Sequence, residues 1–208
     1  MLKQFYTKYL LEAGIDEVAR GCLAGRVYSA VVIWPKEFDE PECHPIIKDS
    51  KKLSKQRREY LKDYIEEYAI DFSVGWVDEK YVDRHNIQNA TFKAMHNAID
   101  GLHVSVDMLL VDGNRFQPYW EKEGAVIPHK CIIDGDAKYA SIACASILAK
   151  VYHDHYIEDL CRSNPELNEK YGWLTNMCYG TAQHIEGIKK YGLSPYHRRT
   201  FGICKNYA

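Results

Sequence analysis

Five short segments of the chain carry the alternating or continuous apolar pattern that is typical of β-strands. They span about residues 9–17, 26–34, 69–77, 104–111 and 131–133. β-Branched residues are frequent in them, and glycine or proline follows several of them. Between them, apolar residues recur every three or four positions, as in amphipathic helices. These helical segments span about residues 54–67, 79–101, 138–162 and 181–191. Ser54 is expected to cap the first helix and Asn86 to interrupt the second.

The mixture of strands and helices predicts an α/β fold built around one sheet. With 208 residues the chain is long enough for one substantial core and a small additional lobe. We therefore expect a core over residues 1–163 and a small C-terminal helical extension over residues 164–208. Small side chains in the longest predicted helix would let it lie close to the sheet. They occur at positions 140, 141, 144, 145 and 149.

The composition, with 46% hydrophobic and 27% charged residues, is that of an ordinary globular protein. No apolar segment is long enough to suggest a membrane span, and residues 1–7 do not resemble a signal peptide. Seven cysteines without a C-x-x-C pair argue against a zinc ribbon or a disulfide framework and favour reduced thiols. We therefore expect a cytoplasmic location. The net charge of −2 does not by itself indicate a nucleic-acid ligand, so such a role would need local basic patches.

Acidic residues end three of the predicted strands. They are Asp16 with Glu17, Asp112, and the pair Asp134 and Asp136. Open α/β sheets place their sites at strand ends, so we expect these carboxylates to meet. Because side chains alternate along a strand, Asp16 and Glu17 should point to opposite faces and share an ion only at the strand end.

Several carboxylates in one place repel one another unless cations are bound. Oxygen-only ligands favour hard ions such as Mg²⁺ or Mn²⁺, and pairs of such ions serve in phosphodiester cleavage. Two simpler interpretations stay open: Asp112 is a turn former before Gly113, and Asp136 is a helix N-cap.

The order and spacing of several motifs resemble those of the ribonuclease HII family over nearly the whole chain. The matching segments are AGIDEVARGCLAG (13–25), DSKKLS (49–54), NATFKAM (89–95), LLVDGNR (109–115), GDAKYASIACASILAKV (135–151) and the tail motif YGW…YGT..H…G.SP.HR..F (171–201). The resemblance implies an RNase H-like fold, a mixed five-stranded sheet flanked by helices with a small C-terminal helical extension that contributes to substrate binding. It also implies a nucleic-acid partner and no membrane, and we expect a monomer.

The activity that the resemblance implies is endonucleolytic cleavage of RNA in RNA/DNA hybrids and 5′ of single ribonucleotides embedded in duplex DNA. The products would carry 3′-hydroxyl and 5′-phosphate ends. On this resemblance the catalytic and metal-binding acids are Asp16, Glu17, Asp112 and Asp136, with Mg²⁺ or Mn²⁺ as the cofactor. Asp134 is the competing assignment for the fourth acid.

The resemblance also assigns substrate-binding residues. The loop Ala19-Arg20-Gly21 would contact the ribose 2′-hydroxyl and a phosphate, although relatives carry glycine in place of Ala19. Tyr179 would sense the RNA-to-DNA junction by stacking on the following deoxyribose, although Met177-Cys178 replaces the lysine and glycine that usually precede it.

Two basic clusters are candidates for phosphate contacts, and a solvated helix face is the simpler interpretation of each. They consist of Lys51, Lys52, Lys55, Arg57 and Arg58, and of Lys189, Lys190, Arg198 and Arg199. His153-Asp154-His155 does not predict a metal site, because consecutive helical residues point apart. At most, Asp154 would support a neighbouring group.

Three alternatives remain open at this point. Ribonuclease HIII would carry an additional N-terminal domain and usually a glutamate as its fourth acid, and Asp136 counts against it. A phosphatase acting on small phosphoesters could use the same four acids but leaves the basic clusters and Tyr179 without a role. A hybrid-binding module with a dead site is disfavoured by the presence of all four acids.

Overall fold

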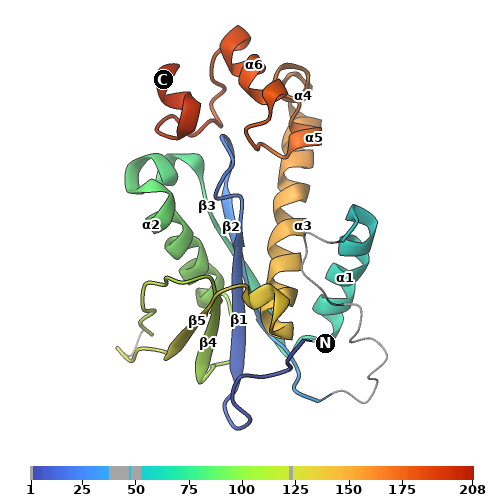
Figure 1. Ribbon diagram of the computed structural model, residues 1–208, viewed down its shortest axis with the longest axis vertical. Helices are drawn as coiled ribbons and strands as arrows, with labels where there is room; N and C mark the ends of the chain where they lie inside the picture. Colours follow the sequence, from blue (N-terminus) through green and yellow to red (C-terminus); the bar gives the residue numbers. More distant parts are fainter. Residues whose placement is uncertain (1, 38–46, 48–52, 122–123) are drawn as a thin grey trace.

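A computed structural model of the chain describes residues 2–37, 47, 53–121 and 124–208. Its centre is a five-stranded sheet in the order β3-β2-β1-β4-β5 (Figure 1). The strands are β1 (Glu12–Val18), β2 (Val27–Ile33), β3 (Asp71–Val77), β4 (Met108–Asp112) and β5 (His129–Ile132). The neighbours β1–β2 and β2–β3 are antiparallel, whereas β1–β4 and β4–β5 are parallel. The mixed five-stranded sheet is therefore confirmed.

Several strand boundaries differ from the prediction, three of them clearly. The first strand begins at Glu12 rather than near residue 9, and Tyr9 is 89% exposed. The fourth begins at Met108 rather than 104, because Val104 and Val106 pack on the core from an irregular segment. The fifth ends at Ile132, and the following Ile133 is exposed. In each case the apolar pattern extends beyond the hydrogen-bonded ladder.

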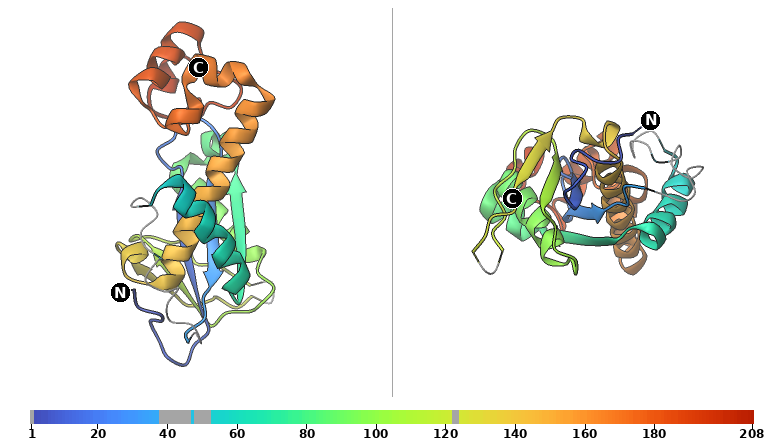
Figure 2. Two further views of the ribbon diagram at one scale, coloured as in Figure 1. Left: turned by 90° about the vertical axis from the view of Figure 1, so that its right-hand side faces the viewer. Right: turned by 90° about the horizontal axis from the view of Figure 1, so that it is seen from below.

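Helices cover both faces of the sheet (Figure 2). α2 (Glu79–Asp100) packs on β2 and β3 from one side, and α3 (Ala140–Ser163) packs on β1 and β2 from the other, with α1 (Lys55–Tyr68) beside α3. Both predicted helix signals are confirmed. Ser54 accepts a hydrogen bond from the Arg57 amide, and Asn86 has non-helical backbone angles (φ 64°, ψ 166°) within α2.

A close approach between β1 and α3 sets the position of the acidic strand. A Cβ atom at Gly14 would lie 2.3 Å from the carbonyl carbon of Ser141, so a larger residue cannot be accommodated there. The small residues of α3 were expected to allow this packing, and they are buried against the sheet. As a result, the α3 face that follows Ser141 lies beside the end of β1.

The C-terminal segment forms a group of short helices beyond one end of the sheet (Figure 1). They are α4 (Pro165–Tyr171), α5 (Trp173–Asn176), α6 (Ala182–Tyr191) and the 3₁₀ helix η4 (Gly202–Asn206). Their apolar side chains pack with the end of α3 and with residues 19–24. Asp83 of α2 fixes the segment further by accepting hydrogen bonds from the amides of Arg199 (3.0 Å) and Thr200 (2.8 Å).

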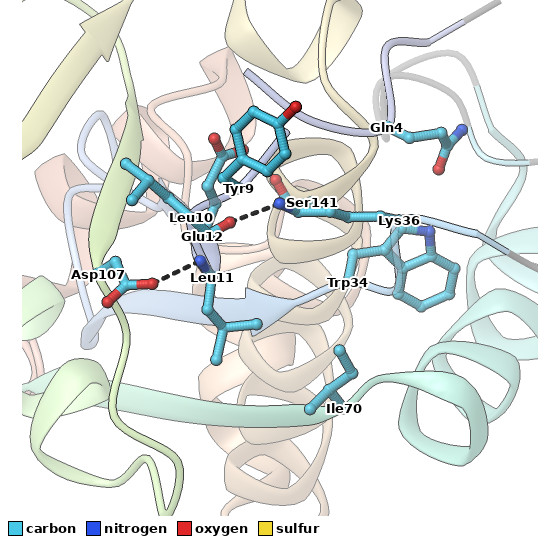
Figure 3. A pocket seen from close by; sticks show the side chains of 10 residues that line it. All are labelled: Gln4, Tyr9, Leu10, Leu11, Glu12, Trp34, Lys36, Ile70, Asp107 and Ser141. Atoms are coloured by element: carbon cyan, nitrogen blue, oxygen red, sulfur yellow. Dashed lines mark hydrogen bonds between the residues drawn. The ribbon is translucent and has the colours of Figure 1, made fainter. Parts of the chain in front are cut away.

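The largest cavity described, about 390 Å³, lies at the start of β1, the end opposite to Asp16 and Glu17 (Figure 3). Its charged side chains close the loop that precedes the strand. Lys36 Nζ donates to the carbonyls of Thr7, Lys8 and Leu10. Glu12 accepts from the amides of Tyr6 and Thr7. We therefore interpret this cavity as part of the scaffold.

Two findings concern the composition. Within the described ranges, no helix is long and apolar enough to cross a membrane. The six cysteines in those ranges are all free thiols, in agreement with the expectation that they do not form disulfides; Cys43 lies outside them.

Candidate active site

Two strand ends bring three carboxylates together. β1 and β4 run parallel with Ile15 opposite Val111, so their carboxyl ends meet at one edge of the sheet. Asp16, Glu17 and Asp112 all line one cavity of about 170 Å³. Its other lining residues are Val18, Arg58, Ser146, Lys150 and Tyr179.

The electrostatic environment of Asp16 disfavours its charged form. Burial raises the pKa of Asp16 well above its ordinary value, and the charges of Glu17 and Asp112 raise it further. A hydrogen bond from Ser146 and one from the Glu17 amide (2.7 Å) oppose this shift without cancelling it. A raised pKa of this kind is expected where carboxylates lie close together and no positive charge lies between them. The cavity therefore favours bound positive charge.

Glu17 lies on the other face of the sheet from Asp16. Asp16 contacts Ser146 of α3, whereas Glu17 also lines a second cavity, about 330 Å³, with Gln88 and Thr91 of α2. The predicted opposite-face arrangement is confirmed. Burial raises the pKa of Glu17, although Arg20 lies beside it with Nη1 3.1 Å from Oε1. The two cavities share Glu17 and Asp112 as their common wall.

Asp136 occupies a different structural position from the one expected. It lies within the 3₁₀ helix η3 (Gly135–Ala137) rather than at a strand end, and α3 begins later, after Tyr139. It is therefore not the N-cap of that helix. The Gly135 amide donates to Asp112 Oδ1 at 2.7 Å, which joins η3 directly to the end of β4. Asp136 is buried and Asp134 is exposed.

Three of the four acids line the cavity, and they do not form a ready-made ion cage. Asp136 is not among the residues that line the cavity of the other three. In the ranges that the structure describes, no three His, Cys, Asp or Glu side chains are arranged to hold a metal ion as they stand. Nevertheless, the donor set consists of carboxylate oxygens, which suits a hard divalent cation, and the protein's own groups do not offset the burial and like charges that raise the pKa of Asp16.

The buried side chain of Arg198 holds the loop after β1. Its guanidinium donates to five backbone carbonyls at 2.8–3.3 Å, those of Ala19, Arg20, Cys22, Gly25 and Arg26. Arg198 is 0% exposed, and burial lowers its pKa. The assignment of Arg198 to a phosphate-binding cluster is therefore wrong, because its donors are all directed at this loop.

The first position of this loop has a left-handed backbone conformation. Ala19 has φ 71°, in the left-handed region that residues with a Cβ atom adopt at a cost. The position therefore does require positive φ, and here an alanine adopts it. Two of the hydrogen bonds around it are Arg198 Nη1 to the Ala19 carbonyl (2.8 Å) and the Cys22 amide to the same oxygen (3.2 Å).

Tyr179 lies against this loop. Leu23 N donates to the Cys178 carbonyl at 2.8 Å, and the Tyr179 hydroxyl interacts with the Ala19 backbone and the Cys22 thiol. Its ring covers Gly21, where an added Cβ atom would lie 3.6 Å from Cε1. The structure thus brings Ala19, Arg20, Gly21 and Tyr179 together beside the acids, from segments about 160 residues apart in sequence.

Sequence reasoning missed two polar residues of the site, Ser146 and Lys150 of α3, and named only Asp154 as possible support for a neighbouring group. Ser146, Lys150 and Asp154 recur every four residues along α3 and so share one face, and this spacing was the signal that could have identified them. Asp154 accepts from Lys150 Nζ at 2.7 Å and lies 3.8 Å from Arg58 Nη2. Burial alone would raise the pKa of Asp154, but hydrogen bonds from His153 and Lys150 lower it. Asp154 therefore holds the positively charged side chains of Lys150 and Arg58 at the acidic cavity.

The remaining basic candidates have separate positions. Lys51 and Lys52 lie outside the described residues. Lys55 pairs with Glu158, and the Arg57 guanidinium lies 4.9 Å from the centroid of the Tyr60 ring. Lys189 pairs with Glu186 at 2.7 Å on the surface of α6. Among the three described members of the first cluster, only Arg58 lines the cavity that contains the acids.

Comparison with known proteins gives a consistent result. The family model for Ribonuclease HII matches residues 13–204. Ribonuclease HII from Parabacteroides distasonis is 45% identical over 203 residues, 98% of this chain and 96% of the relative. The ribonuclease H2 from Pyrococcus horikoshii OT3 matches with a TM-score of 0.73 and 25% identity, over 94% of this chain and 96% of that one. Bst-RNase HIII in complex with Mn²⁺ has the same fold, with a TM-score of 0.67 and 19% identity, and 68% of that chain is covered.

Proposed function

This chain belongs to the ribonuclease HII family of endoribonucleases that act on RNA/DNA hybrids, and we propose that it also cleaves duplex DNA 5′ of a single embedded ribonucleotide. The products carry 3′-hydroxyl and 5′-phosphate ends. One observation carries the proposal: three carboxylates, the side chains of Lys150 and Arg58, and Tyr179 line one cavity. This cavity lies beside the loop Ala19-Arg20-Gly21.

We propose that Asp16, Glu17, Asp112 and Asp136 hold Mg²⁺ or Mn²⁺. Three of these acids line the cavity, and the fourth lies one residue after Gly135, whose amide binds Asp112. When bound, such ions supply activation of the attacking water and charge for the leaving 3′-oxygen. The protein supplies the carboxylates at fixed points, because the hydrogen bond from Gly135 orients Asp112 and that from Ser146 orients Asp16.

Recognition of the ribose is assigned to the loop that Arg198 holds. The 2′-hydroxyl alone distinguishes RNA from DNA at one nucleotide, so a rigid backbone surface is needed to detect it. Residues 19–21 offer such a surface, because their carbonyls at 19 and 20 are already bound by Arg198 and the chain cannot rotate freely. Arg20, which is exposed, is available to a phosphate.

Phosphate contacts on the other side of the acids are assigned to Lys150 and Arg58. Both line the cavity, and buried Asp154 fixes their direction. Positive groups that are held in place before substrate binds stabilise a polyanion without losing side-chain entropy on binding. A phosphatase for small phosphoesters would not need this extended arrangement, which favours a nucleic-acid strand as the substrate.

Tyr179→Ala is expected to lower cleavage at a single ribonucleotide about tenfold or more relative to cleavage of a long RNA/DNA hybrid, since stacking on an aromatic ring contributes ~1–3 kcal/mol. The measurement is the ratio of initial rates on the two substrates. Tyr191→Ala removes another exposed tyrosine of the same extension and is the matched control. Equal losses on both substrates would remove the junction role from Tyr179.

A nicking assay tests the proposed function directly. The protein is incubated with Mg²⁺ or Mn²⁺ and a labelled DNA duplex that contains one ribonucleotide, and the product ends are mapped. Cutting on the 5′ side with a 3′-hydroxyl end supports the proposal. A binding module would shift the duplex without cutting it, and a phosphatase would leave it unchanged; either result would contradict the proposal.

We also propose that residues 164–208 contribute to substrate binding, with residues 1–163 as the catalytic core. Tyr179 and Arg198 support this division, since both belong to the extension and contact the loop after β1. The proposal also includes a cytoplasmic location, which the free thiols of the described residues support, and a monomeric state.

A further inference from the structure

Two buried histidines form a hydrogen-bond network that reaches the backbone of Tyr179. His184 of α6 and His197 are 0% and 1% exposed, and their Nε2 atoms are 3.1 Å apart. Trp173 Nε1 lies 3.0 Å from the same Nε2 atom of His184. On its other side, His184 Nδ1 lies 3.0 Å from the carbonyl oxygen of Tyr179. No part of the proposed reaction uses these groups.

The neighbours of each ring determine where its proton is. The Ser194 amide can only donate, and it lies 2.9 Å from His197 Nδ1, so the proton of neutral His197 is on Nε2. The Trp173 N–H can also only donate, so Nε2 of His184 is an acceptor and its proton is on Nδ1. His197 Nε2–H and Trp173 Nε1–H therefore both donate to His184, and His184 Nδ1–H donates to Tyr179.

Both rings are held in the neutral form that this network requires. Burial lowers the pKa of His184, and burial together with the charge of His184 lowers the pKa of His197 to about 3. A second proton on His184 Nε2 would point at the N–H groups of Trp173 and His197. One on His197 Nδ1 would point at the Ser194 amide, with the Ser194 hydroxyl 2.8 Å from the same atom. Near neutral pH His184 therefore donates from its ring to the backbone before α6, to the Tyr179 carbonyl 3.0 Å from Nδ1 and also toward Cys178.

The backbone before Tyr179 needs such support. Met177 and Cys178 have φ values of 45° and 65°, so two consecutive residues with a Cβ atom adopt the left-handed region here. The Asn176 side chain accepts from the Cys178 amide at 3.0 Å and so supports the first half of this turn. The second half is bound at the Tyr179 carbonyl by His184.

We propose that His184 is a positioning residue for substrate discrimination: its Nδ1–H bond to the Tyr179 carbonyl fixes the Tyr179 ring over Gly21. This proposal rests on the function proposed above, in which Tyr179 senses the junction. His197 and Trp173 act one step further back, by keeping the proton of His184 on Nδ1. The extension thus contacts the recognition site twice, through Arg198 at the loop and through His184 at Tyr179.

Two substitutions at one position separate the hydrogen bonds of His184. In His184→Asn the side-chain amide nitrogen replaces Nδ1 and can still donate to Tyr179, whereas the acceptor for Trp173 and His197 is lost. In His184→Gln the amide oxygen replaces Nε2 and can still accept from them, whereas the donor to Tyr179 is lost. A purely structural role predicts that activity follows thermal stability in both variants, and the positioning role predicts that it does not.

Initial rates are measured on a duplex with one ribonucleotide and on a long RNA/DNA hybrid, with a thermal melt for each variant. His184→Gln is expected to lower the rate ratio about tenfold, since one hydrogen bond has about this weight. His184→Asn is expected to keep the ratio within about twofold despite the lower melting temperature that unpaired buried donors cause. In a Tyr179→Ala background, His184→Gln should change the ratio no further. An unchanged ratio in His184→Gln, or equal losses in both variants, would overturn the proposal.

Nuclear magnetic resonance supplies readouts that do not depend on activity. The ¹³C′ shift of Tyr179 should move in His184→Gln and stay in place in His184→Asn. In the unmodified protein, ¹⁵N shifts of the imidazoles should show His184 protonated at Nδ1; protonation at Nε2 would overturn the proposal even if no variant folds. Failure of the wild-type protein to nick would instead contradict the proposed function, and the carbonyl shift would still decide whether His184 holds Tyr179.

Discussion

Asp112→Asn is expected to lower the single-turnover rate of nicking about 10³-fold or more, because loss of one charge-stabilising group in a catalytic site commonly costs this much. The fold should persist. The Asp112 oxygen that accepts from the Gly135 amide at 2.7 Å has a counterpart in the asparagine oxygen, so the link between β4 and η3 remains. The substitution removes only the negative charge of Asp112, while Asp16 and Glu17 remain in the cavity.

The matched control for this variant is Asp134→Asn. Asp134 is exposed and has φ 53°, a conformation that asparagine tolerates well, so its removal should change the rate by less than about twofold. Thermal melts with and without Mg²⁺ complete the experiment: the ion should stabilise the wild-type protein more than Asp112→Asn. Normal cutting by Asp112→Asn, or a loss of similar size in the control, would refute the assignment of the acids.

Arg198→Lys is expected to lower the free energy of unfolding by about 3 kcal/mol, because a lysine ammonium has at most three donors and no planar fork. Arg198 satisfies five carbonyls of the loop from Ala19 to Arg26, and several of them would be left buried without a donor. Since the same loop is assigned to ribose recognition, cleavage should fall together with stability.

Urea denaturation and the nicking rate at a temperature well below the melting point together test this variant. Arg199→Lys is the control, because Arg199 is the neighbouring arginine and its side chain is exposed. It should change the free energy of unfolding by less than about 0.5 kcal/mol. If Arg198→Lys were as stable and as active as the control, the role of Arg198 in holding the loop would be wrong.

The acidic residues show which parts of the site can be predicted from strand patterns. Alternation predicted that Asp16 and Glu17 face opposite sides, and the parallel pairing of β1 with β4 confirms that Asp112 joins them at one edge. The same reasoning failed for Asp136, which lies in η3 and not at a strand end. A short turn of three residues has no periodicity, so nothing in the local sequence distinguishes it from a strand end or a helix cap.

For the basic residues, sequence patterns did not predict which side chains are buried. Arg198 and Arg199 are identical in type and adjacent, yet one is fully buried in a ring of carbonyls and the other is exposed. Composition and spacing cannot separate them, because burial depends on contacts with residues more than 170 positions away. The same holds for His184, whose partners Trp173 and Tyr179 surround it only once the extension has folded.

By itself, the sequence determined the α/β architecture, the acids of the two central strands, the interruption of α2 at Asn86 and the family, since periodicity and ordered motifs are local properties that survive without coordinates. Only the tertiary structure decided which charged groups are buried, what Arg198 and Asp154 hold, and how the extension supports Tyr179. The physical reason is that hydrogen bonding and desolvation act between segments that are distant in sequence, and their balance exists only in the folded chain.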